Sequence, residues 1–214
     1  MPVWVFLFSY TTESNAMLLD AATKAQLKSY LERATTPIEI VASLDNSEAS
    51  GDVRSLLKDI AESSALVTVT ESLADNLRKP SFSINRPSEN HGPRFAGLPM
   101  GHEFTSLILA LLQVGSYPPK IEDDVLEQIR ALDGDFDFEI YVSLTCHNCP
   151  DVVQALNVMA VQNPRIRATM IEGGTFPDEV KAREIMAVPT VFLNGTEFGH
   201  GRMKIGRASW RERV

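Results

Sequence analysis

An internal repeat constrains the fold of this chain more than any other feature of its 214 residues. The segment EIVASLDNSEASGDVRSLL, which begins at Glu39, aligns without gaps with EIYVSLTCHNCPDVVQALN, which begins at Glu139. Further along, KPSFSIN parallels VPTVFLN, so that Pro80 stands opposite Pro189. Matches that recur in the same order indicate two copies of one structural unit. We therefore predict an α/β protein that contains the same fold twice.

The second copy shows the order of elements most clearly. FDFEIYVSL alternates and is rich in aromatic and β-branched residues, which predicts a strand, and the apolar residues from Val152 to Ala160 recur at helical intervals. RIRATMI predicts a second strand, and PDEVKAREIM a charged helix with Val180 and Ile185 inward. PTVFLNGTEFG predicts two strands around an Asn-Gly turn. This order resembles that of thioredoxin, with a mixed central sheet flanked by helices.

The thioredoxin family has a proline at the start of the strand after the second helix, in a cis peptide bond that faces the dithiol. By this resemblance we expect Pro189 to be a cis-proline facing the dithiol. A strand-edge proline without such a role is the alternative, because the sequence does not distinguish the two isomers.

The repeat divides the chain into a first fold without cysteines at residues 18–118 and a second fold at 119–205. Residues 1–17 are predicted to be an extension outside the fold, and 206–214 a tail. HEFTSLILALLQVG supplies a closing helix for the first fold, whereas GRMKIGRASWRERV has no apolar face of matching length. Either the chain was cut before the second closing helix, or these last residues are not native coding sequence. We expect the second fold to lack its last helix.

The two cysteines of the chain, Cys146 and Cys149, both lie in the segment SLTCHNCPDVVQAL. A disulfide between them closes too short a loop to stabilise a scaffold, and zinc needs about four ligands, which the four scattered histidines do not complete. We therefore expect no metal site. Two inert neighbouring cysteines remain an alternative, but the pattern favours a dithiol that opens and closes.

The motif lies where a strand ends and a helix begins, with Pro150 and Asp151 suited to the first helical turn. Unpaired N–H groups and the helix dipole at such a position stabilise a thiolate and lower the pKa of the first thiol. Cys146 is therefore the predicted nucleophile, and Cys149 the residue that resolves a mixed disulfide. The first copy has Asn46 and Ala49 at these positions, so it cannot carry out thiol chemistry.

Composition excludes several other classes of protein. With 44% hydrophobic and 22% charged residues the chain can form a globular core, and a net charge of -8 without a basic stretch argues against nucleic-acid binding. No apolar run approaches the roughly 20 residues that span a membrane. The opening MPVWVFLFSYTTESNA has no Lys or Arg before its apolar core and is a poor secretory signal, so we expect a cytoplasmic protein.

Four segments closely resemble the N-terminal domain in the family of alkyl hydroperoxide reductase flavoproteins known as AhpF: GPRFAGLPMGHEFTSLILALL, DGDFDFEIYVSLTCHNCPDVVQALNVM, NPRIRATMIEGGTF and VPTVFLNGTEFGHGRM. The resemblance covers about residues 18–205. It implies tandem thioredoxin-like folds in which one dithiol, at Cys146 and Cys149, takes electrons from a flavin-containing part of the same polypeptide and passes them to a peroxiredoxin disulfide. FAD and NADH would bind beyond residue 205, since this chain has no G-x-G-x-x-G that opens a helix. A dimer is expected only in the full-length protein.

The same resemblance places Glu103, in GHEF, near the dithiol, where a carboxyl group could exchange protons with the thiols. An acidic residue in a first helical turn is also favoured by the helix dipole alone. His147 could increase the thiolate fraction when protonated or simply be solvated, and Asn148 has no predicted role.

Two other functions compete with the electron relay. One is a general protein disulfide reductase or isomerase, resembling the two-fold glutaredoxin-like oxidoreductases. The other is a redox-inactive docking module that binds a partner through the first copy and the acidic surface.

Overall fold

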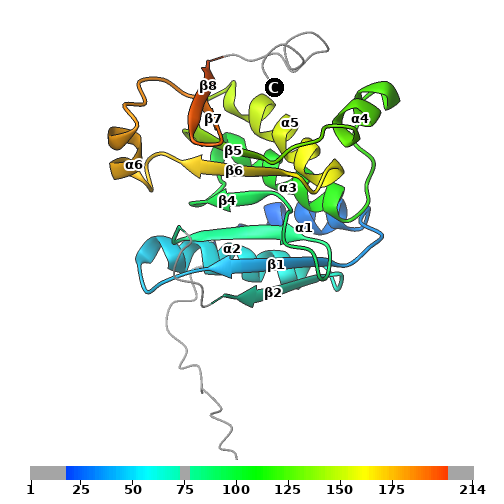
Figure 1. Ribbon diagram of the computed structural model, residues 1–214. Helices are drawn as coiled ribbons and strands as arrows, with labels where there is room; N and C mark the ends of the chain where they lie inside the picture. The colour runs from blue at the N-terminus through cyan, green and yellow to red at the C-terminus, as the bar shows by residue number, and fades with distance from the viewer. Residues whose placement is uncertain (1–17, 73–77, 202–214) are drawn as a thin grey trace, which may run out of the picture.

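Both copies of the repeat contribute four strands to one continuous sheet in the computed structural model, which describes residues 18–72 and 78–201 (Figure 1). The strand order is β2-β1-β3-β4-β6-β5-β7-β8. The predictions for residues 1–17 and 206–214 lie outside the described residues. The strands are β1 (Ile38–Ser43), β2 (Val67–Glu71), β3 (Ser81–Asn85), β4 (Arg94–Ala96), β5 (Phe136–Val142), β6 (Ile166–Glu172), β7 (Thr190–Leu193) and β8 (Thr196–His200).

The two halves of the sheet have the same topology, which confirms the prediction of tandem thioredoxin-like folds. In each half the first strand pairs in parallel with the second and antiparallel with the third, and the third and fourth are antiparallel. The halves join where β4 pairs in parallel with β6, with Phe95 opposite Met170. The outer edge of the fourth strand of the first copy is therefore paired with a strand of the second copy.

Two helices begin at a residue whose side chain caps them. Asp20 accepts a hydrogen bond from the backbone of Thr23 at the start of α1, and Ser47 does the same for Ser50 in α2. Pro150 lies in the first turn of α5. The helices are α1 (Ala21–Leu31), α2 (Glu48–Ser63), α3 (Phe104–Val114), α4 (Asp123–Arg130), α5 (Cys149–Gln162) and α6 (Pro177–Ala182), and a 3-10 turn, η1 (Gly101–Glu103), precedes α3.

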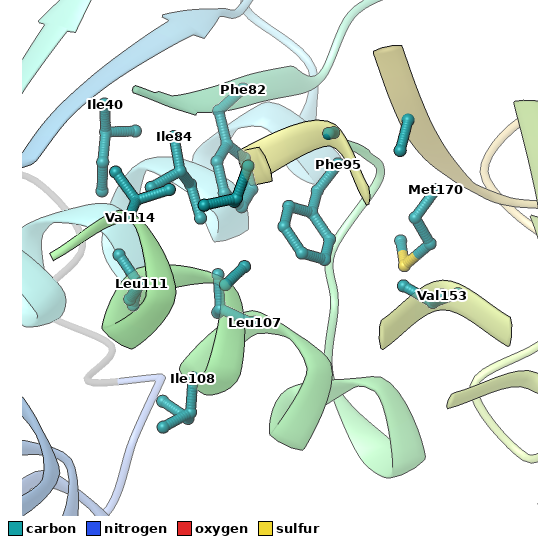
Figure 2. Close-up of a cluster of buried hydrophobic side chains, with 14 of the residues drawn as sticks. Ile40, Phe82, Ile84, Phe95, Leu107, Ile108, Leu111, Val114, Val153 and Met170 are labelled. Atoms are coloured by element: carbon teal, nitrogen blue, oxygen red, sulfur yellow. The ribbon is translucent and has the colours of Figure 1, made fainter. Parts of the chain in front are cut away.

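The main core fills the space between the sheet and helices α1, α2, α3 and α5. Figure 2 shows part of it, where side chains of β3, β4 and α3 from the first copy lie near Val153 and Met170 of the second. The rings of Phe82 and Phe95 stack with their centroids 5.4 Å apart. One hydrophobic core thus runs through both copies without interruption at their junction.

The opposite face of the second copy is covered by α6 and the chain around it. Val180 and Ile185 pack there against a smaller cluster that includes Tyr141 and Phe192, so both point inward as predicted. The helix itself ends at Ala182, so the sequence prediction of a helix through Met186 was wrong at its end. Glu184 has a φ of 52°, which turns the chain out of the helix toward β7.

The prediction that the second copy lacks its closing helix concerns the chain after β8, which ends at His200, and so lies outside the described residues. Leu193 and Phe198, in the last two strands of the sheet, are partly buried against the main core.

Candidate redox site

The C-x-x-C turn connects the end of β5 to the start of α5, as the sequence predicts. Cys146 and Cys149 form a disulfide, with their Cα atoms 5.5 Å apart. Cys149 is the first residue of α5 and is 0% exposed, whereas Cys146 is only partly buried. A molecule that approaches from solvent therefore reaches the sulfur of Cys146 first.

The loop before β7 lies directly against the sulfur of Cys146. The peptide bond between Val188 and Pro189 is cis, and the carbonyl oxygen of Val188 is 3.7 Å from Cys146 Sγ. The hydroxyl group of Thr190 donates a hydrogen bond to the carbonyl of Ala187 and so fixes the turn. Lys79–Pro80, the matching bond of the first copy, is also cis. Near this loop, the side chain of Met186 is 94% exposed.

The first copy contributes the η1 turn to the other side of the site. The backbone N–H of His102 donates a hydrogen bond to the carbonyl of Leu144, and the rings of His102 and His147 lie 4.3 Å apart. Gly101 has a φ of 58°, and a Cβ at this position would lie 2.6 Å from the oxygen of Leu144. Only glycine permits so close an approach at this backbone conformation.

Glu103, the last residue of η1, is 0% exposed. Its side chain makes no capping hydrogen bond to α3, and neither carboxyl oxygen has a hydrogen-bond partner among the described residues. Burial raises the pKa of Glu103 to about 7, with a smaller opposing effect from the nearby Ser106 hydroxyl. A carboxyl group with such a pKa can accept and release a proton at neutral pH.

A network of ion pairs lies on the face of the sheet that α6 covers, opposite the main core, and the sequence analysis did not predict it. Arg78, which precedes β3, forms ion pairs with Glu139 of β5 and Glu179 of α6, and Arg183 pairs with the other oxygen of Glu139. Tyr141 donates a hydrogen bond to Glu179, and the pKa of Glu179 is lowered, chiefly by its hydrogen bond with Arg78. The network ties α6, which leads into the loop before β7, to both copies. No local motif marks it, because Arg78 and Glu179 are 101 positions apart.

Residues 18–72 and 78–201 contain neither a candidate metal site nor a candidate membrane-spanning helix. No group of three or more His, Cys, Asp or Glu side chains there has the arrangement of a metal site. None of the helices in these ranges has both the length and the apolar composition that a membrane span requires.

Comparisons with known proteins agree with this site. Residues 136–207 match the family model of a thioredoxin domain. The F subunit of alkyl hydroperoxide reductase in Escherichia coli (strain K12) is 57% identical over 188 residues, and that of Pseudomonas putida 59% over 186 residues. These matches cover 88% and 87% of this chain but only 36% of each relative, so the chain spans about a third of their length.

A solved structure extends the likeness to both copies. The NTD_N/C domain of the alkylhydroperoxide reductase AhpF from Enterococcus faecalis (V583) superimposes with a TM-score of 0.79 and 31% sequence identity. The superposition covers 87% of this chain and 95% of that one.

Proposed function

This chain belongs to the family of AhpF N-terminal domains of alkyl hydroperoxide reductase, and from that premise we propose that it relays electrons to a peroxiredoxin. Its thioredoxin-like folds carry one pair of cysteines spaced for thiol–disulfide exchange, which makes it a thiol-disulfide oxidoreductase module. The observation that carries the proposal is the disulfide itself, with one accessible and one buried sulfur at the start of α5.

The reaction begins with the reduced dithiol. The thiolate of Cys146 attacks one sulfur of the peroxiredoxin disulfide, so that a mixed disulfide forms and one peroxiredoxin thiolate leaves. Cys149 then loses its proton and attacks Cys146 Sγ, which breaks the mixed disulfide and releases the second peroxiredoxin thiolate. Two electrons have passed to the peroxiredoxin, and the Cys146–Cys149 disulfide has formed.

Two further residues take part in this proposal. Pro189 holds the loop that faces Cys146, which orients an incoming disulfide. Glu103 accepts the proton that Cys149 loses and returns one when the dithiol is regenerated. His147 and Asn148, both exposed in the active turn, have no assigned role in the electron transfer.

The electrons would come from a dithiol in the flavin-containing part that the family resemblance implies for the longer protein. There NADH would reduce FAD, and the flavin would reduce the dithiol that recharges Cys146 and Cys149. Such a relay requires a reducing dithiol, with a potential nearer the roughly -270 mV of thioredoxin than the roughly -120 mV of strong oxidants.

Trapping the mixed disulfide tests the proposal directly. Oxidised bacterial C-type peroxiredoxin is mixed with the reduced Cys149→Ser variant, and the products are separated without reductant and weighed by mass spectrometry. We expect a one-to-one adduct through Cys146, and none with Cys146→Ser as the matched control. The same experiment with oxidised insulin distinguishes a general disulfide reductase, which would form both adducts at similar rates. No adduct with either protein would support a redox-inactive docking module.

A further inference from the structure

A buried polar contact joins the two copies close to Glu103. Ser106 in the first turn of α3 is 0% exposed, and its Oγ accepts a hydrogen bond of 3.2 Å from Nε2 of Gln154 in α5. Most neighbouring side chains in α3 are buried and apolar, including Leu107, Ile108 and Leu111. A hydroxyl group in such surroundings loses its contacts with water, so its hydrogen bonds matter more than those of a surface serine.

The direction of this hydrogen bond determines whether the Ser106 hydroxyl can still donate a second one. Because Gln154 is the donor, an acceptor lone pair of Ser106 is occupied while its O–H remains free to donate. Ser106 follows Glu103 by three positions, which places the two side chains on the same side of the helical turn. Glu103 offers two carboxyl oxygens without a partner among the described residues.

We propose that Ser106 and Gln154 are positioning residues for Glu103, with Gln154 orienting the Ser106 hydroxyl so that it stabilises the carboxylate when Glu103 ionises. This inference rests on the proposed function, in which Glu103 exchanges protons with the dithiol. Ser106 lowers the pKa of Glu103, although neither carboxyl oxygen has a hydrogen-bond partner among the described residues. The bond forms when the proton leaves and negative charge develops on the carboxylate.

The ionisation of Glu103 reflects this balance. Burial raises its pKa, and Ser106 is the group that lowers it again. Without Ser106 the buried carboxyl would remain protonated at neutral pH and accept a proton from Cys149 less readily. The other titratable groups on the surrounding elements are His102 in η1, Cys146 and His147 in the active turn, and Cys149 and Asp151 at the start of α5.

Titration of Glu103 by carbon NMR tests the inference in the full 214-residue chain. The side-chain carboxyl signal, assigned by its loss in Glu103→Gln, is followed through the neutral pH range in the disulfide form. We expect Ser106→Ala to move the midpoint upward by about one pH unit, as the loss of a hydrogen bond to a charged group implies. Gln154→Leu should move it in the same direction by a smaller amount, and Ser106→Thr, which keeps the hydroxyl, should restore it.

A matched serine controls for a general effect of the substitution. Ser83 is also buried and accepts a hydrogen bond from a side-chain amide, that of Asn85, but it lies in β3. Ser83→Ala should leave the Glu103 midpoint unchanged. An unchanged or lower midpoint in Ser106→Ala would overturn the inference. If that variant does not fold, an unchanged midpoint in Gln154→Leu, at a half-buried position, would overturn it instead.

A second readout links the titration to reactivity. The rate at which dithiothreitol reduces the Cys146–Cys149 disulfide is measured as a function of pH. Ser106→Ala should shift this pH–rate profile toward higher pH, in the same direction as the NMR midpoint. In the Glu103→Gln background Ser106→Ala should leave the profile unchanged, and a shift there would contradict the inference. Neither readout uses a peroxiredoxin, so a failure of the relay in the adduct experiment remains distinguishable from a failure of this inference.

Discussion

A buried carboxyl group that has no hydrogen-bond partner in the described part of the chain makes the stability of this protein depend on pH. Burial raises the pKa of Glu103 from 4.5 to about 7, so between these values the folded state binds a proton that the unfolded state has released. Its stabilising effect is complete below about pH 4.5 and is lost as the pH rises through 7. We expect wild type to lose about 3 kcal/mol across this range relative to Glu103→Gln, measured by urea unfolding. Glu127→Gln, at an exposed position in α4, should keep the wild-type pH dependence.

Single residues differed in how far the sequence could predict them. The C-x-x-C motif placed Cys146 and Cys149, because the strand-to-helix turn that positions them is encoded by adjacent residues. The role of Pro189 was expected only from the family resemblance, since the sequence does not distinguish the isomers of its peptide bond. The burial of Glu103 was not predictable in this way, because it arises where the two copies meet. The same holds for Ser106, whose partner Gln154 is 48 positions away. The burial and hydrogen-bond partners of such a residue come from the other copy, so the neighbouring sequence does not reveal them.

At the scale of elements, the contact between η1 and the active turn depends on Gly101. An alanine there would combine an unfavourable positive φ with a Cβ 2.6 Å from the oxygen of Leu144. We expect Gly101→Ala to destabilise the protein by about 2 kcal/mol or more, measured by urea unfolding. Gly195→Ala is the matched control, because its φ is also positive at 82° but a Cβ there meets nothing within 4 Å. Equal losses in the two variants would show that the close approach of η1 contributes nothing.

The ion-pair network of Arg78 connects α6 to the sheet across the two copies. The side chains of Arg78 and Glu139 are mostly buried, so removing the guanidinium leaves carboxylates partly without a partner. We expect Arg78→Met to cost about 2 kcal/mol in urea unfolding at neutral pH. Arg165→Met is the control, since the pair of Arg165 with Asp133 is exposed and longer at 3.4 Å, and it should cost less than about 0.5 kcal/mol. Similar costs for both variants would contradict a structural role for the network.

Elements with a strong local pattern were predicted well, and those shaped by tertiary contacts were not. The strands on either side of the Asn194–Gly195 turn and the helix after the C-x-x-C motif follow from periodicity and turn chemistry. In α6, by contrast, the charged pattern continues to Met186 although the helix ends at Ala182. There Arg183 pairs with Glu139 of β5, a contact that a pattern within the helix does not reveal.

For the whole molecule, the repeat predicted two folds but not how they join. The two folds join through β4, a strand of three residues. One edge of β4 pairs with β3 of the first copy, and the other edge pairs with β6 of the second copy. Phe95 lies at its centre, fully buried, with its ring stacked on Phe82 of the first copy and its backbone opposite Met170 of the second. Since the sheet and the core are both continuous across this strand, neither copy can lose it without exposing apolar side chains of the other.

We therefore expect the two copies to unfold as one cooperative unit. Phe95→Ala should destabilise the protein by about 3–5 kcal/mol, as for other large buried aromatic residues. In a reduced sample the second copy is followed by labelling of the Cys149 thiol and the first by hydrogen exchange in β1. Both midpoints in urea should fall together and by the same amount, because the core that Phe95 fills belongs to both copies. A first copy that unfolds while Cys149 stays protected would show instead that the joint transmits little stability, and that the redox fold stands without its inactive partner.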